Sequence, residues 1–365
     1  MDFFKSSLDS LLRLGKENLG TPPGLEGMAD LETPPELGVL SIKTVDFSAE
    51  GINQETYESI DDLLGTQKPE WATCRWIDIQ GVHPYAINRL KQTFNIHTLA
   101  AEDALNIPQR QKMEEYDDML FIILRMLRIE EDQLFNEQVS FFFLDDTLIT
   151  LQEKSGDIWE PVRERIQREG SRLRKHGAPY LLYALIDAII DHVFPILDNY
   201  FDVINEMEQE ILTQPKENAQ MRIHSIKREL AYLRQALWPM RDISSTLHKN
   251  DFKLLPRKVV PYFRDVHDHS LQAIEAVEMY LDNANGLQDL LMNANANRMN
   301  EVMKALTIMA SLFMPITFFA GLYGMNFEHI PELGWKYSYP VFLGLCALTT
   351  ICLLIYFKRK GWIGK

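Results

Sequence analysis

Two stretches near the C-terminus contain no charged side chain, and they constrain the fold more than any other feature. The first runs from 305 to 327 and the second from 337 to 357, without a single Asp, Glu, Lys or Arg. A helix needs about 20 apolar residues to cross the hydrocarbon core of a bilayer, and both stretches reach that length. We therefore predict two transmembrane helices, at 304–324 and 337–357, joined by an extracytoplasmic loop at 325–336.

The charges that flank these stretches predict the orientation of the chain. The tail at 358–365 begins with Lys-Arg-Lys, and Lys304 precedes the first stretch. Basic residues collect on the cytoplasmic side of membrane proteins. No secretory signal is expected at the N-terminus, because charged residues interrupt its apolar positions. We expect a multi-pass protein of the plasma membrane with both termini in the cytoplasm.

The residues before the first membrane helix predict an α+β organisation. Pro- and Gly-rich composition predicts a mobile segment at 1–37. The parts expected after it are a cytoplasmic α/β domain at 38–177, an antiparallel helix pair at 178–250 and a stalk helix at 257–303. No proline lies between Tyr262 and Met314, so the stalk is expected to continue into the first membrane helix. A helix of that length needs partners, and copies of itself are the expected ones.

Residue types within the α/β domain predict its strands and helices. Runs of β-branched and aromatic residues predict strands at 39–45, 75–79, 119–127, 138–144 and 148–152. Apolar residues at helical spacing predict helices at 84–94, 98–105 and 159–176. The expected fold class is thus an α+β membrane protein.

The composition excludes several classes of function. The chain has 37 Lys and Arg against 52 Asp and Glu, a formal charge of −15, which argues against a nucleic-acid partner. Three cysteines make no disulfide framework. The sequence shows no Gly-rich phosphate loop, Ser-His-Asp order or Cys-x-x-Cys pair, so we expect no enzymatic activity. A membrane-anchored scaffold protein is an alternative class that the composition leaves open.

A motif follows the first membrane helix, where the chain reads Tyr323-Gly324-Met325-Asn326-Phe327-Glu328 and then Pro331-Glu332-Leu333. At this position the motif resembles the CorA-type magnesium transporters. Residues 160–165, 260–265 and 300–304 are similar to the same family, as is the order of the parts over about 38–362. The family usually has Met where this chain has Ile330. A related branch that transports Zn²⁺ keeps Gly-Met-Asn and is the alternative, although Glu328 and the Pro-Glu-Leu run favour the magnesium branch.

The resemblance implies a funnel-shaped homopentamer in the lipid bilayer, whose first membrane helix lines a pore while the second faces lipid. Gly324, Met325 and Asn326 would form the selectivity filter. Small or polar residues recur at helical spacing along the first membrane helix, a pattern that fits the implied pore lining and that helix packing alone would also give. The predicted lining residues are Asn300, Met303, Leu306, Ala310, Met314 and Thr317. The expected activity is influx of hydrated Mg²⁺ driven by the membrane potential, with Co²⁺ and Ni²⁺ as further candidate ions.

The resemblance also implies that divalent cations regulate the channel from the cytoplasm. Asp103 and Asp265 would meet across a subunit boundary and bind Mg²⁺, and Glu102, Asp187 and His269 match a second, neighbouring site. On composition alone these side chains are solvated positions on helices. Two further acidic features are predicted to attract cations. They are an inner vestibule ring of Asp289 and an extracytoplasmic pair, Glu328 and Glu332.

Overall fold

The computed structural model describes residues 30–130, 133–249, 252–326, 328 and 330–363. Most of the mobile segment predicted at 1–37 lies outside the described residues. The chain divides into two compact units. The first comprises Met1–Glu206 and Met221–Asn285, and the second comprises Met207–Gln220 and Gly286–Lys365. Each unit is considered by itself below.

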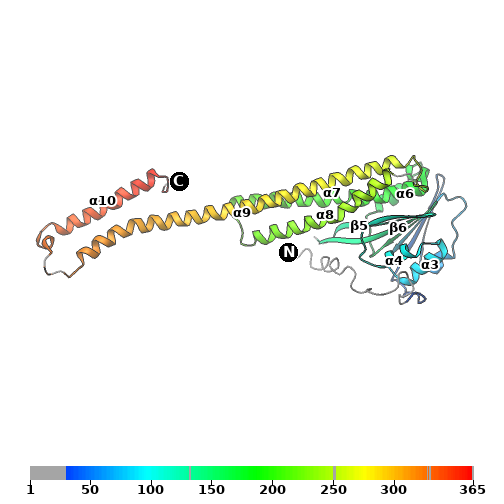
Figure 1. Cartoon of the computed structure of the whole chain (residues 1–365), viewed down its shortest axis with the longest axis horizontal. Coiled ribbons are helices and arrows are strands. Elements are labelled where there is room, and N and C mark those ends of the chain that lie inside the picture. The colour runs from blue at the N-terminus through cyan, green and yellow to red at the C-terminus, as the bar shows by residue number, and fades with distance from the viewer. Residues whose placement is uncertain (1–29, 131–132, 250–251, 327, 329, 364–365) are drawn as a thin grey trace. The chain divides into compact units, whose positions relative to one another are not determined.

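The described part of the first unit contains a seven-stranded mixed sheet in the order β2-β1-β3-β7-β6-β5-β4 (Figure 1). Its strands are β1 (Ser41–Phe47), β2 (Ile52–Tyr57), β3 (Cys74–Gln80), β4 (Lys112–Tyr116), β5 (Met119–Glu130), β6 (Gln133–Phe143) and β7 (Thr147–Gln152). The β3–β7 pair is parallel, with Arg75 opposite Thr147, and the other pairs are antiparallel. The inner strands are those that β-branched and aromatic residues predicted.

The sequence patterns missed the two edge strands, β2 and β4. Their sequences, INQETY and KMEEY, are largely polar, and many of their side chains are exposed or half-buried. A strand that is paired on one side only buries little apolar surface, so it carries little of the alternation that marks an inner strand.

Helices lie between the strands and directly after the last strand along the chain. They are α2 (Ile60–Leu64), α3 (Pro84–Phe94), α4 (Thr98–Leu105), α5 (Glu160–Gln167) and α6 (Arg172–Asp191). Apolar residues of α3 and α4, such as Leu90 and Ala101, pack with Phe121 and Ile149 of the sheet in one buried cluster. The bounds of α3 and α4 are those predicted.

The single helix predicted at 159–176 is wrong, because the chain forms two helices there. Gly170 has a φ of +72°, in the left-handed region that ends helices. Ser171 then caps α6 by accepting a hydrogen bond from the backbone N–H of Arg174.

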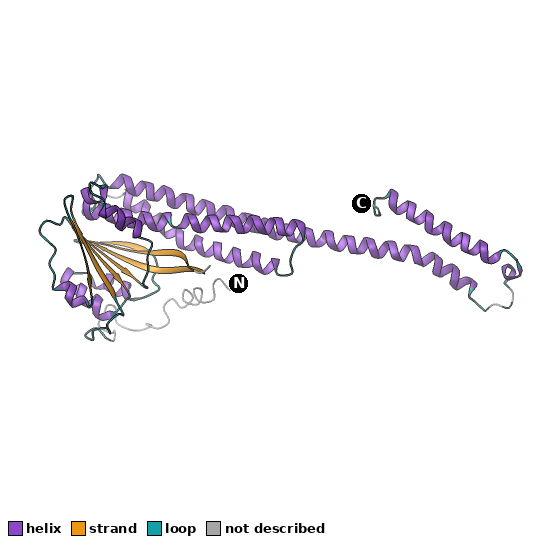
Figure 2. Ribbon diagram, turned by 180° about the vertical axis from the view of Figure 1, so that it is seen from behind, coloured by secondary structure: helices purple, strands orange, loops and turns teal. Residues whose placement is uncertain are grey.

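Three long helices follow: α7 (Val193–Thr213), α8 (Ala219–Lys249) and α9 (Val260–Tyr323). The parts of these helices that belong to the first unit lie side by side (Figures 1 and 2). Tyr200 of α7 donates a hydrogen bond of 2.9 Å to Glu229 of α8, and the rings of Phe201 and Tyr280 lie 6.1 Å apart. These contacts hold the start of α9 against its neighbours.

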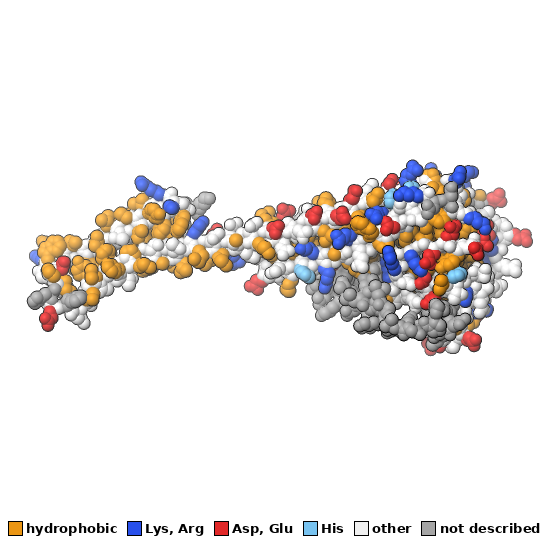
Figure 3. Space-filling model, in the orientation of Figure 1, with side chains coloured by type: hydrophobic (Ala, Val, Ile, Leu, Met, Phe, Trp, Pro, Cys, Tyr) orange, Lys and Arg blue, Asp and Glu red, His pale blue; other side chains and the backbone are white. Residues whose placement is uncertain are grey.

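The second unit contains the rest of α9, the short 3-10 helix η2 (Pro331–Gly334) and α10 (Ser338–Arg359). Pro315 lies inside α9 without ending the helix. Apolar side chains cover α10 and the last part of α9 almost without charge (Figure 3). Such a surface is unfavourable in water, and it is typical of helices in contact with lipid.

Three helical segments of the described chain are long and apolar enough to cross a membrane, but only two expose their apolar residues. In Arg172–Thr213, 67% of the most apolar window is buried inside the protein. The corresponding share is 0% in α9 and 11% in α10. The first segment is therefore an internal helix, and the prediction of two long apolar C-terminal helices able to span a membrane is confirmed.

Candidate functional site

The predicted pore-lining residues all lie on α9. Their separations of three or four positions place them along one face of the helix. All of them, Asn300, Met303, Leu306, Ala310, Met314 and Thr317, are exposed in the single chain. Met314 is 70% exposed and Leu306 is 60% exposed. Apolar side chains with this exposure require lipid or another protein chain to cover them.

The predicted filter residues follow the last turn of α9 directly. The backbone N–H of Gly324 donates to the carbonyl of Ala320 at 2.9 Å, and that of Met325 donates to Leu322 at 3.4 Å. A Cβ on residue 324 would lie 3.0 Å from the Ala320 oxygen, so a larger residue would crowd this turn. Asn326 is exposed immediately after the turn.

The surroundings of Asn326 favour a cation. Backbone carbonyls at a helix C-terminus carry a partial negative charge. Glu328 and Glu332 follow within a few residues, and both are exposed. Asp289, predicted for the inner vestibule, is exposed on α9. Each of these acidic side chains is therefore accessible to solvent in the single chain.

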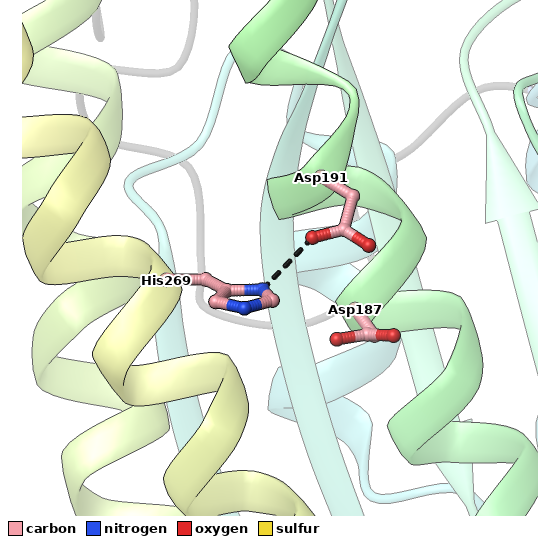
Figure 4. A group of neighbouring side chains, drawn as sticks. All are labelled: Asp187, Asp191 and His269. Atoms are coloured by element: carbon pink, nitrogen blue, oxygen red, sulfur yellow. Dashed lines mark hydrogen bonds and ion pairs between the residues drawn. The ribbon is translucent and has the colours of Figure 1, made fainter.

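In the first unit the structure brings together Asp187, Asp191 and His269 (Figure 4). His269 of α9 places Nδ1 2.9 Å from a carboxylate oxygen of Asp191 on α6. One ligand atom from each of the three residues lies within 4.8 Å of the others. The resemblance predicted Asp187 and His269, but Asp191 was missed. Its spacing of four from Asp187, which puts both on one helix face, was the available signal.

Burial shapes the charge of this cluster. Burial, together with the charge of Asp191, raises the pKa of Asp187 to about 6. Oδ1 of Asp187 is buried and has no hydrogen-bond partner in the described chain. A cation would satisfy that oxygen and relieve the repulsion between the carboxylates. The residues present therefore fit a divalent cation: the carboxylates suit Mg²⁺, whereas the imidazole suits transition metals such as Ni²⁺ or Zn²⁺.

Asp265 lies beside this cluster, whereas Asp103 has partners of its own. Asp265 is on α9 one turn before His269, and 3.9 Å separate its carboxylate from Nε2 of that residue. Asp103 on α4 pairs with Lys112 at 2.6 Å and accepts a hydrogen bond from Gln109. Within the described part of one chain, no hydrogen bond or ion pair joins Asp103 to Asp265. Their predicted meeting therefore needs a second subunit.

Glu102 precedes Asp103 on α4 and is half-buried. Among the described residues it does not belong to the group formed by Asp187, Asp191 and His269. Of the three residues predicted for the second site, the structure thus brings two together within one chain, Asp187 and His269.

Cation binding at the Asp187 cluster is expected to weaken as the pH falls through 6. Only the deprotonated carboxylate is a ligand, and Asp187 takes up its proton near pH 6. Titration of the full-length protein with Co²⁺ at pH 7.5, 6.5 and 5.5 is expected to show about a fourfold loss of affinity between the first and the last pH. Asp198→Asn, an exposed acid on α7, is the control and is expected to retain this dependence. A pH-independent affinity in the wild type would contradict the prediction.

The chain matches a family of known proteins over most of its length. Residues 71–359 match the family described as CorA-like Mg²⁺ transporter protein. The cobalt/magnesium transport protein CorA of Thermotoga maritima is 40% identical over 325 residues. That alignment covers 88% of this chain and 92% of the relative. The resemblance that the loop motif indicated is confirmed.

Solved structures share the fold at lower identity. The complete structure of the CorA magnesium transporter from Methanocaldococcus jannaschii matches with a TM-score of 0.75 and 21% identity, over 88% of this chain and 98% of that one. The cytoplasmic domain of ZntB from Vibrio parahaemolyticus matches with a TM-score of 0.57 and 17% identity, over 71% and 99%. These matches support the predicted sheet domain with its long helices.

Proposed function

We propose a transport function on the premise that this chain belongs to the CorA-like Mg²⁺ transporter family, whose sequence model matches residues 71–359. The proposed protein is a homopentameric channel for hydrated Mg²⁺ in the plasma membrane, with both termini in the cytoplasm. One observation supports the proposal in addition to the family match. The last part of α9 is free of charge, exposes its apolar residues and ends at the Gly-Met-Asn motif. No enzymatic activity is proposed.

Several copies of the chain are needed to form a pathway, because two membrane helices cannot enclose one. We assign the pore to α9, whose exposed face carries the oxygen atoms of Asn300 and Thr317, with Asn326 beyond its end. Mg²⁺ gives up its water ligands reluctantly, so neutral oxygens that bind the water shell suit it. Carboxylates at the same places would hold the ion too tightly for release. We assign α10 to the lipid-facing side.

The membrane potential is the proposed driving force. Coupled transporters generally place an ionisable residue inside the membrane, and neither stretch, 305–327 nor 337–357, contains Asp, Glu, Lys or Arg. A divalent ion that crosses 100 mV gains about 4.6 kcal/mol, twice the ~2.3 kcal/mol of a single charge. That free energy is enough for substantial accumulation without a second substrate.

Internal Mg²⁺ is the proposed inhibitor. Asp103 and Asp265 of adjacent subunits would share one ion, and Asp187, Asp191 and His269 would hold another. An ion that binds only the closed state stabilises that state by RT ln(1 + [L]/Kd) per site. When internal Mg²⁺ falls, repulsion between the vacated carboxylates favours the open state.

Removal of Lys112 is expected to make the channel close at lower internal Mg²⁺. Its ammonium group pairs with the Asp103 carboxylate. Burial opposes the shift, but the hydrogen bonds that Lys112 donates to Asp103 and Glu114 raise its pKa. Lys112→Gln is expected to lower the half-inhibiting concentration about fivefold, equivalent to the ~1 kcal/mol of such a pair. Currents recorded over a series of internal Mg²⁺ concentrations measure the half-inhibiting concentration.

Lys68→Gln is the matched control, because Lys68 also pairs with an aspartate of the first unit, Asp146. It is expected to leave the inhibition unchanged. Equal inhibition of the Lys112→Gln variant and the wild type would show that Asp103 is not a ligand of the regulatory ion.

Ion selectivity decides between this proposal and its rivals. The related branch that transports Zn²⁺ keeps Gly-Met-Asn, so the motif alone does not select the ion. Uptake of Mg²⁺, Co²⁺, Ni²⁺ and Zn²⁺ into proteoliposomes, with and without a pH gradient, tests the point. We expect Mg²⁺ uptake that needs only a negative interior potential. Uptake of Zn²⁺ alone would favour the related branch, and no uptake of any ion would favour a scaffold protein.

A further inference from the structure

A pocket of about 760 Å³ in the first unit collects three arginines. Arg125 comes from β5, Arg234 from α8, and Arg110 from the segment before β4. None of them belongs to the predicted pore or to the acidic sites. In the described chain, no acidic side chain forms an ion pair with any of the three. The chain carries 15 more acids than bases, so a shortage of acids does not explain this.

Arg125 is the most informative of the three because it is buried, with an exposure of 6%. Its guanidinium makes one hydrogen bond, from Nη2 to the carbonyl oxygen of Gln109 at 3.1 Å. Burial lowers its pKa, and Glu153 and Tyr232 only partly oppose that shift. The Glu153 carboxylate instead accepts the backbone N–H of Gln138. A buried cation with so few partners is unfavourable until an anion reaches it.

Other buried arginines of the same sheet domain show the contrast. Arg75, 5% exposed, makes two hydrogen bonds of 2.7 Å to the carboxylate of Asp46. Arg163 pairs with both Asp78 and Asp157. Arg174, 4% exposed, has no acidic partner among the described residues but donates to two backbone carbonyls, those of Ile166 and Gln167. Arg125 thus has fewer partners than these arginines. Within the described part of the chain it has no acidic partner, and its side chain lines the pocket.

The remaining walls of the pocket suit an aromatic group that carries hydrogen-bond donors. Trp238 is 42% exposed, and the guanidinium of Arg241 lies 4.5 Å from its ring centroid. Oδ1 of Asn136 is buried without a hydrogen-bond partner in the described chain. Pro239 lacks an N–H, so the carbonyl of Gln235 one turn earlier has no helical partner. Both oxygens can accept from an amino group.

We propose that this pocket binds a nucleoside polyphosphate. The three arginines would receive the phosphates, Trp238 would stack on the base, and the oxygens of Asn136 and Gln235 would accept from the base. The volume is within the range of small-molecule sites. Phosphates without bound Mg²⁺ carry more negative charge, so the metal-free nucleotide is expected to bind more tightly than its Mg²⁺ complex.

Calorimetric titration of the full-length protein in detergent with adenosine triphosphate and EDTA tests the proposal. We expect saturable binding, weakened about 100-fold in the double variant Arg110→Ala/Arg234→Ala, at about tenfold for each charge-assisted contact. Both side chains are exposed, so the fold is expected to survive. Arg168→Ala removes an exposed arginine outside the pocket and is expected to bind normally. Inorganic tripolyphosphate is expected to bind at least fivefold more weakly than the nucleotide, by about the worth of one stacking contact.

Arg125→Met separates ligand binding from a structural role. It is expected to abolish binding while the melting temperature stays unchanged or rises, because the cation has no acidic partner to lose. Four results would overturn the proposal. They are no saturable binding of the nucleotide, equal binding by the wild type and the double variant, equal affinity for tripolyphosphate, and a lower melting temperature of Arg125→Met without loss of binding.

Discussion

Asn326→Ala is expected to reduce Mg²⁺ uptake into proteoliposomes by at least about 100-fold, because each subunit loses a hydrogen-bonding group of ~0.5–1.5 kcal/mol. The carboxamide is exposed directly beyond the last turn of α9, where the helix carbonyls and two following glutamates already favour a cation. In a ring of subunits, the side chains together would bind the water shell of one ion. Alanine at the same position offers that shell no polar atom.

The control for Asn326→Ala replaces another asparagine, one that lies on α9 itself. Asn283 is exposed on α9 within the first unit, and Asn283→Ala is expected to retain full uptake. Size-exclusion chromatography of both variants shows whether the oligomer is intact. Uptake above half of the wild-type rate in an assembled Asn326→Ala protein would refute the filter assignment.

Asp265→Lys is expected to remove the dependence of the current on internal Mg²⁺. The Asp265 carboxylate is 60% exposed and lies 3.9 Å from His269, at the edge of the acidic cluster. A lysine there carries a permanent positive charge that neutralises the facing carboxylates as the ion would. Currents at low and high internal Mg²⁺ are therefore expected to differ by less than about twofold, because binding of the ion no longer distinguishes the closed state.

Asp268→Lys provides the matched control, since Asp268 is also exposed on α9 but lies outside the metal-binding group. It is expected to keep the inhibition of the wild type. The regulatory site lies elsewhere if Asp265→Lys and Asp103→Lys are both inhibited by internal Mg²⁺ as strongly as the wild type.

The elements that sequence patterns predicted well are those whose burial leaves a strong signal. The inner strands β3, β5 and β7 consist largely of buried residues, and the two membrane helices are apolar over their whole length. The edge strands β2 and β4 were not predicted, because polar residues suit a strand with one free edge. The break at Gly170 was missed because a glycine inside a helical pattern is ambiguous until its φ is known.

The candidate sites likewise differ in how much of each could be predicted from the sequence. The loop motif and the predicted pore face could be picked out from the sequence because their residues are close neighbours along the chain, and their roles stay predictions. The pair of Lys112 with Asp103 was not predicted, since it depends on where the polar strand β4 lies relative to α4. Asp191 joins the metal-binding group only because α6 packs beside α9. The arginine pocket unites strands and a helix that are far apart in sequence, as Gln111 and Ala236 are, at a separation of 125 positions.

The unbroken course of α9 has a mechanical consequence for the gate. Its 64 residues form one continuous helix that carries both Asp265 and the predicted pore-lining residues. Pro315 removes one hydrogen bond of that helix, from the turn that contains Met314. Bending is easiest at that point. Under the proposed function, cation binding at Asp265 and the width of the pore therefore act on the same helix, with Pro315 as its point of easiest bending.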